Sequence, residues 1–248
     1  TPTVRVGDWA WITLYWRDTG LVELSGAPLA YLELFGRAFE RIGLQTGYQG
    51  RGTFPVTLWP EDGIIADRTA IRVEGSADAP VEARLTVKTG EEGTGVEVGR
   101  LKVIPAGWPE TTAPVAVLGD GIELAAAEVT PASAAPGESV EVRLRWQVAA
   151  PPGPALLHVF AHLGDPQLPP LAQFDGPLMD GEYPSRLWEA GEVMEETLVL
   201  TLPAELPPGE YPIHVGIYQY DTGNRLPVHI DGARQPADTY TVGRILVP

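Results

Sequence analysis

The sequence predicts an all-β protein made of two tandem antiparallel β-sandwich domains, immunoglobulin-like or jelly-roll-like in topology and related by internal duplication. Three observations support this prediction. Apolar and polar residues alternate with a period of two, as in half-buried strands, and helical periodicity is nearly absent. The 25 prolines and 28 glycines separate these runs with turns. Three sequence blocks also recur in the same order.

The first repeated block predicts a strand near the start of each domain. Residues 7–16 (GDWAWITLYW) match residues 137–146 (GESVEVRLRW) in the pattern G-[DE]-x-x-x-[IV]-x-L-x-W. Alternate side chains of a strand point to opposite faces, so one parity of each block faces the core. The residues expected to be inward are Ala10, Ile12, Leu14 and Trp16 in the first copy, and Val140, Val142, Leu144 and Trp146 in the second.

The second and third blocks extend the repeat. Residues 52–59 match 181–188, and the match continues without a gap, so that 64–73 corresponds to 193–202. The last block pairs 98–103 with 242–247. Tryptophans recur in both copies at matching positions, and this recurrence favours a core role. They are Trp16, Trp59, Trp146 and Trp188.

The remaining elements are expected to be short strands joined by turns. Residues 156–163, 211–220 and 240–247 alternate as strands, and 90–99 fits a hairpin. Residues 31–42 fit either a short helix or a strand. The turn signals are Pro151-Pro152-Gly153, Pro207-Pro208-Gly209 and Asp221-Thr222-Gly223-Asn224.

The domain boundaries follow from the repeat. We expect a first sandwich at 1–105, a linker at 106–114 that carries Pro, Gly and Thr, and a second sandwich at 115–248. A predicted strand at 122–129 opens the second copy and has no counterpart in the first. Either the matching strand lies upstream of Thr1, or the first domain does without it.

Composition disfavours several kinds of partner. The net charge of −16 repels nucleic acid phosphates and anionic lipid headgroups, so neither is expected as a partner. The chain has no cysteine, which excludes disulfides and thiolate-bound metals. It has no apolar run of the length that a membrane span needs, so we expect no membrane insertion by this segment.

The second copy resembles a domain found near the ends of large membrane glycosyltransferase-like proteins, mostly of Chloroflexi-type bacteria. This resemblance implies an extracytoplasmic β-sandwich appendage of a membrane-anchored protein, without an assigned activity. It covers nearly all of 120–248 and, more faintly, the first copy. The residues that carry it are Leu144-Arg145-Trp146, 159–163 (VFAHL), 172–175 (AQFD), 183–188 (YPSRLW), 207–211 (PPGEY), 215–218 (VGIY) and 223–226 (GNRL).

An aromatic row is the candidate binding site. If Ala10 and its parity face the core, then Trp9, Trp11, Thr13 and Tyr15 lie on the outward face. Such a row has three explanations: it packs against another domain or a missing segment, it binds a protein partner, or it stacks on sugar rings. The sequence leaves all three open.

No catalytic, cofactor or metal site emerges from the motifs. His158 and His162 share one face of a strand but stand roughly 13 Å apart, too far for one metal ion. A glycosidase would need two carboxylates at a defined separation, and nothing selects such a pair among Asp165, Asp175, Asp180, Glu182, Glu189 and Glu192. A calcium site at loop carboxylates such as Asp175, Asp180 and Asp221 has only composition in its favour, because no EF-hand spacing occurs. We therefore expect a non-catalytic extracytoplasmic interaction module, with carbohydrate binding as the alternative.

Overall fold

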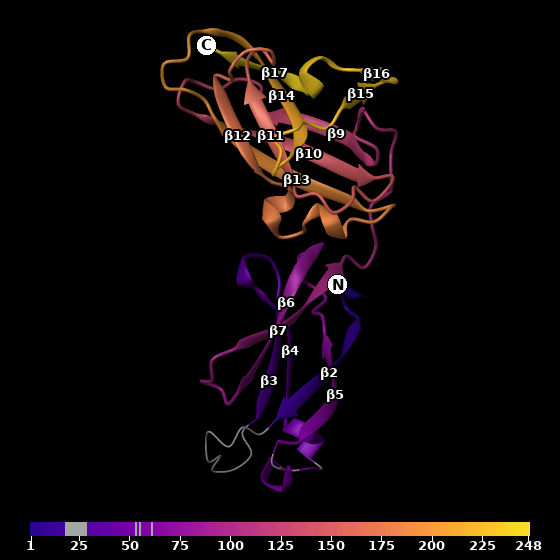
Figure 1. Ribbon diagram of the computed structural model, residues 1–248. Helices are drawn as coiled ribbons and strands as arrows, with labels where there is room; N and C mark the ends of the chain where they lie inside the picture. The colour runs from indigo at the N-terminus through magenta and orange to yellow at the C-terminus, as the bar shows by residue number, and fades with distance from the viewer. Residues whose placement is uncertain (18–28, 53, 55, 61) are drawn as a thin grey trace. The chain divides into compact units, whose positions relative to one another are not determined.

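The computed structural model describes residues 1–17, 29–52, 54, 56–60 and 62–248, and these residues form an all-β protein (Figure 1). The chain divides into two compact units, Thr1–Gly107 and Trp108–Pro248. This division falls inside the segment 106–114 that the sequence analysis expects to be a linker. Each unit has its own sheets and its own hydrophobic core.

The first unit is a sandwich of two sheets. One sheet has the order β1-β7-β6-β3-β4, and the other pairs β2 with β5. Buried aliphatic residues from both sheets, including Leu34, Ile71 and Val103, fill the space between them. The strands are β1 (Thr3–Arg5), β2 (Trp9–Arg17), β3 (Ala30–Phe35), β4 (Arg41–Gly47), β5 (Ile64–Arg72), β6 (Val81–Thr89) and β7 (Val96–Ile104), and the 3₁₀ helices are η1 (Arg37–Phe39), η2 (Gln49–Gly52) and η3 (Val56–Leu58).

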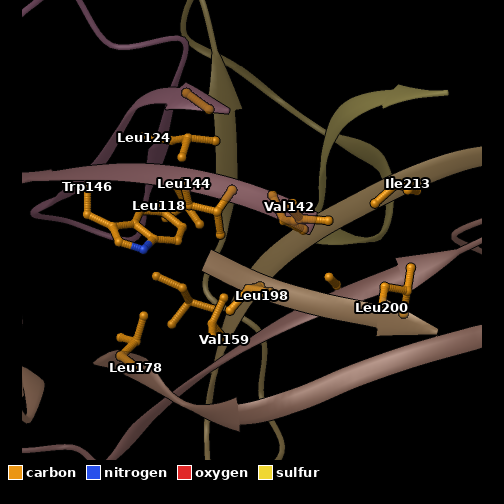
Figure 2. Packing of buried hydrophobic residues seen from close by; sticks show 14 of the residues in the cluster. Leu118, Leu124, Val142, Leu144, Trp146, Val159, Leu178, Leu198, Leu200 and Ile213 are labelled. Atoms are coloured by element: carbon orange, nitrogen blue, oxygen red, sulfur yellow. The ribbon is translucent and has the colours of Figure 1, made fainter. Parts of the chain in front are cut away.

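The second unit is a larger sandwich. Its sheets have the orders β13-β10-β9-β8-β15-β16 and β12-β11-β14-β17. Figure 2 shows its core, in which Leu144 and Trp146 of β10 lie among Leu124, Leu198 and Val159 from three other strands. The strands are β8 (Ala116–Leu118), β9 (Ile122–Thr130), β10 (Ser139–Val148), β11 (Leu157–Leu163), β12 (Ala172–Pro177), β13 (Val193–Thr201), β14 (Gly209–Gln219), β15 (Val228–Ile230), β16 (Ala233–Arg234) and β17 (Tyr240–Val247), and the 3₁₀ helices are η4 (Leu178–Gly181), η5 (Ser185–Leu187) and η6 (Pro236–Asp238).

The predicted sandwich class is confirmed, and strand order selects between the two topologies. In the second unit, the first, second and fifth core strands (β9, β10, β13) share one sheet, and the others (β11, β12, β14, β17) share the second. This division is that of immunoglobulin-like sandwiches. The described ladders are antiparallel except β1 on β7, which are parallel.

The two units share strand register at the positions that the repeat pairs. Trp16 of β2 stands opposite Ile65 of β5, and Trp146 of β10 stands opposite Met194 of β13. The ladders β6–β7 and β14–β17 also agree, because each has an irregularity next to a strand residue that faces a glycine, Gly99 or Gly243. Common descent of the two units stays a prediction.

A tryptophan–carboxylate hydrogen bond occurs at the same place in each unit. Trp16 Nε1 donates to Asp67 Oδ2 at 3.3 Å, and Trp146 Nε1 donates to Glu196 Oε2 at 2.9 Å. Each carboxylate is buried and lies one strand away from its tryptophan. An indole N–H needs an acceptor when it is buried, and these carboxylates supply it.

The same carboxylates also accept backbone N–H groups from the 3₁₀ turn that precedes their strand. Gly50 donates to Asp67 at 3.1 Å, and Met179 donates to Glu196 at 2.6 Å. Met179 has a positive φ of 55°, which costs energy for a residue with a Cβ. The buried carboxylate stabilises that conformation by accepting its N–H. Each carboxylate thereby links its turn to the tryptophan on the neighbouring strand.

The expected core role of the recurring tryptophans is met only in part in the first unit, where Trp16 packs against the core but is not fully buried. Trp146 and Trp188 are fully buried, whereas Trp16 and Trp59 are only half-buried. Ile12 and Leu14 of β2 are likewise half-buried, although their counterparts in β10 are buried. The physical reason is coverage: β10 pairs with both β9 and β13, while β2 pairs with β5 alone in the described part of the chain.

Residues 31–42 contain strands, and the helix alternative is wrong there. Strand β3 ends at Phe35, the turn η1 follows, and β4 begins at Arg41. Ala38 and Phe39 have positive φ angles of 47° and 60°, so the chain reverses direction instead of continuing as a helix.

Candidate functional site

The expected aromatic row lies on the outward face of β2. The strand alternates between exposed and less exposed side chains from Trp9 to Arg17. Trp9, Trp11 and Tyr15 are 54%, 67% and 72% exposed. Thr13, between them, is exposed as well. The structure therefore brings the four residues together on one surface, which we call the aromatic face.

Strand β5, which pairs with β2 in the same sheet, places small and cationic side chains beside this surface. Arg72 stands opposite Trp9, Ala70 opposite Trp11, and Ala66 opposite Tyr15. The Arg68 guanidinium carbon lies 5.4 Å from the centroid of the Trp11 ring, within cation–π range. The alanines add little bulk beside Trp11 and Tyr15, which stay exposed. The surface thus combines exposed rings with positive charge on a strongly acidic protein.

The corresponding surface of the second unit has different chemistry. Ser139 and Thr201 share a hydrogen bond of 2.9 Å between their hydroxyl groups. Arg143 forms an ion pair of 2.8 Å with Glu141. Arg145 donates to a backbone carbonyl. Polar side chains thus occupy on β10 the positions that the aromatic residues occupy on β2, so the aromatic face is a specific property of the first unit.

A groove runs beside the aromatic face, between the two sheets of the first unit. It has a volume of about 630 Å³ and is lined by Pro2–Val4 of the β1 segment, Trp9–Ile12 of β2, Leu85 of β6, and Gly99–Leu101 of β7. Sequence reasoning missed this groove. The signal for it was present, because the strand at 122–129 in the second copy has no counterpart in the first.

The histidines of the second unit take part in local packing. The His158 ring lies 4.5 Å from the Tyr220 ring, and His162 Nε2 lies 3.2 Å from Asp175 Oδ2. Burial lowers the pKa of both imidazoles, against the opposing effect of Asp175. Among the residues that the structure describes, no three His, Cys, Asp or Glu side chains converge as a metal site would require.

The carboxylates considered in the second unit lie in structural settings: Glu192 is buried, whereas Asp165 and Asp180 are exposed in turns. The Tyr183 hydroxyl donates to Glu192 Oε2 at 2.7 Å, and burial together with this carboxylate raises the pKa of Tyr183 far above its usual range. Asp165 accepts the backbone N–H of Gln167. Asp180 lies in the strained turn η4 with a positive φ of 53°. The carboxylates considered as calcium ligands do not form a common cluster within the described residues.

Comparisons with known proteins identify no family for this chain. No protein-family model and no curated protein matches the chain. Similar solved structures include a Salmonella alpha-2-macroglobulin mutant, with 14% identity and a TM-score of 0.25 over 98% of this chain. Another is a protein described as membrane anchored from Corynebacterium diphtheriae, with 13% identity and a TM-score of 0.26 over 100% of this chain. The chain spans 14% and 58% of those two proteins.

The helices of the described residues are short. Among them, none has the length and apolar character needed to cross a bilayer. The helical segments are 3₁₀ turns of three or four residues.

Proposed function

We propose that this chain is a non-catalytic accessory module of a larger membrane-associated protein, displayed outside the cytoplasm, and that its first unit binds a protein partner through the aromatic face. The membrane context and location are supported by the resemblance over 120–248. The binding role is supported by the exposure of Trp9, Trp11 and Tyr15 in one row.

The composition of the aromatic face favours a protein partner. Trp, Tyr and Arg are the residues most enriched among those that dominate binding energy at protein interfaces. Here two tryptophans, a tyrosine and Arg68 occupy one small surface. When a partner covers these exposed rings, the removal of their apolar area from water contributes roughly 25 cal/mol of favourable free energy per Å². A partner that carries carboxylates would also complement Arg68 and Arg72.

Carbohydrate binding is the second candidate. Its support is the same row, because exposed indole and phenol rings such as those of Trp9 and Tyr15 can stack on sugar C–H groups. The polypeptide and glycan candidates differ in the molecule that would lie beside Thr13, at the middle of the row.

To test the proposal, Thr13 is replaced by a photo-crosslinking residue, the protein is expressed in its parent cell, and the yield of covalent adducts after illumination is measured. We expect an adduct with a polypeptide, and we expect Trp9→Ala combined with Trp11→Ala to reduce its yield at least about tenfold, as for removal of a hot spot. Mass spectrometry of the adduct identifies its chemical class. An adduct that contains only glycan would favour the second candidate.

Two controls accompany this test. A crosslinker at Arg143, the matching position of the second unit, reports random collisions. Tyr220→Ala removes an equally exposed ring, 57% exposed, from the second unit and should leave the adduct unchanged. A yield at Thr13 no higher than at Arg143 would refute the proposal.

A further inference from the structure

The open edge of β2 is the feature that the proposed function does not explain. In the second unit, β10 has β13 on one side and β9 on the other. In the first unit, β2 has β5 on one side, and the described residues provide no strand on the other (Figure 1). A nine-residue edge strand with exposed aromatic side chains is a template for pairing with another strand.

The groove beside β2 is the place that β9 fills in the second unit. Strand β9 pairs with β10 and also lies against β17, because Val129 Cγ2 comes within 4.0 Å of a Cβ placed on Gly243. Gly99 is the matching glycine of β7, and a Cβ placed there meets no atom of the described residues within 4 Å. Gly99 also lines the groove. The volume that Val129 takes in one unit is thus open in the other.

The burial of the inward row supports the same conclusion. Val142, Leu144 and Trp146 of β10, which has β9 as its neighbour in the sheet, are at most 2% exposed. Ile12 and Leu14, at the matching positions of β2, are half-buried. Removal of one covering strand accounts for this difference, since the strand register and the opposite partner are the same in both units.

We propose that the first unit binds an extended polypeptide strand from outside residues 1–248, which pairs antiparallel with the open edge of β2 and completes the sandwich. Strand β9 indicates the chemistry of this strand. Its Val129, Ala127 and Leu124 stand opposite Val142, Leu144 and Trp146, so the bound strand would place small or medium apolar side chains opposite Ile12, Leu14 and Trp16.

This inference shares with the proposed function only the idea that the first unit binds polypeptide. The two surfaces overlap at Trp9 and Trp11, which also line the groove, but the proposed function uses the outward rings, whereas strand addition uses the backbone groups of β2 and the groove. A failure of crosslinking at Thr13 would leave the strand test intact, because that test uses a synthetic strand and needs no natural partner.

The experiment uses the full chain and a peptide with the β9 sequence, residues Ile122–Thr130. Hydrogen exchange is measured at the amides of β2 and β10. With excess peptide we expect those amides of Trp11–Trp16 that point to the open edge to exchange at least about tenfold more slowly, because pairing buries them. The exchange rates of the β10 amides should stay unchanged. The same peptide carrying Leu124→Asp, Ala127→Asp and Val129→Asp should have no effect, since the groove is apolar.

A matched pair of glycine variants locates the site. Gly99→Val fills the open volume and should abolish the slowing, yet it meets no atom within 4 Å and should fold. Gly47→Val makes the same change in β4, also in open space, and should leave peptide binding intact. Joining the nine residues directly ahead of Thr1 raises the effective concentration of the strand and should raise the melting temperature of the first unit.

Several outcomes would overturn the proposal. One is the absence of slowing with both the free and the joined strand. Another is slowing that persists in Gly99→Val. Protection of Trp11–Trp16 that depends on protein concentration without peptide would show that a second copy occupies the edge. Protection equal to that of β10 in the dilute chain would show that the edge is already covered.

Discussion

At the residue scale, a buried carboxylate organises each unit. Glu196 accepts both the Trp146 indole N–H and the Met179 backbone N–H. Asp67 does the same for Trp16 and Gly50 in the first unit. An isolated charge in a core is unfavourable, but a carboxylate that accepts two directed hydrogen bonds satisfies donors that would otherwise be buried without partners.

The first prediction concerns Glu196. Glu196→Leu keeps an apolar side chain of similar size but leaves two buried donors without this acceptor. At about 1–3 kcal/mol for each of the two unsatisfied donors, we expect the second unit to lose about 2–6 kcal/mol of unfolding free energy. Denaturant titration measures this loss. Glu195→Leu, on the exposed side of the same strand, is the control and should change stability by less than about 0.5 kcal/mol.

At the residue scale the sequence also predicted that the aromatic residues of β2 point outward, and they are exposed. Their binding role stays a prediction. Trp9, Trp11 and Tyr15 share a parity, and a strand turns that parity into a shared surface. The contact of Arg68 with Trp11 was not predictable, because it depends on the register between two strands distant in sequence. Trp16 and Trp59 were expected to be buried but are only half-buried. Their recurrence in the sequence identifies matching positions, but it does not show how well each position is covered by neighbouring strands.

At the element scale, β2 and β10 are the same kind of strand in different surroundings. They hold the same register to their partners, but β10 is central and β2 is at an edge. Burial of a strand depends on its neighbours as much as on its own residues. The same inward side chain should therefore contribute less to stability in β2 than in β10.

The second prediction tests this difference. Leu144→Ala, at a 2% exposed position, should cost about 3 kcal/mol or more, because it leaves a cavity in a closed core. Leu14→Ala at the matching half-buried position should cost about half as much or less, since less area leaves water there. Denaturant-dependent hydrogen exchange, read separately in each unit, measures both values. Equal costs would contradict the open edge.

Other elements were missed by sequence reasoning. Strands β1, β8, β15 and β16 are only two or three residues long, too short to show alternation. Strand β12 contains Gly176 and ends at Pro177, both unfavourable for a strand by composition. Pairing with β11 decides its conformation. Long-range hydrogen bonding thus overrides weak local preference in these segments.

At the scale of the whole molecule, the two units differ in their response to acid. All four histidines of the chain lie in the second unit. Burial lowers the pKa of His158, His162 and His214. Between the lowered folded pKa and about 6.5 in the unfolded chain, the unfolded state binds more protons. The stability that these neutral imidazoles contribute to the second unit is therefore fully present above about pH 6.5 and is lost as pH falls toward their lowered folded pKa values.

The third prediction follows from this distribution. Lowering the pH from about 7.5 to about 5.5 should reduce the unfolding free energy of the second unit and leave the first nearly unchanged. Urea titration with exchange read in each unit separates the two transitions. His214→Gln should weaken the dependence, because this imidazole is 5% exposed. A parallel loss in both units would assign the effect to carboxylates.

The sequence by itself determined the all-β class, the correspondence of the repeated blocks and the parity of β2, because these depend on local alternation and on matching residues. Only the tertiary structure decided which positions are covered, how Glu196 and Asp67 hold their turns, and where the groove lies. Coverage depends on the neighbour across a sheet or between sheets. For β2, that neighbour is the strand corresponding to β9, which the first unit lacks among its described residues.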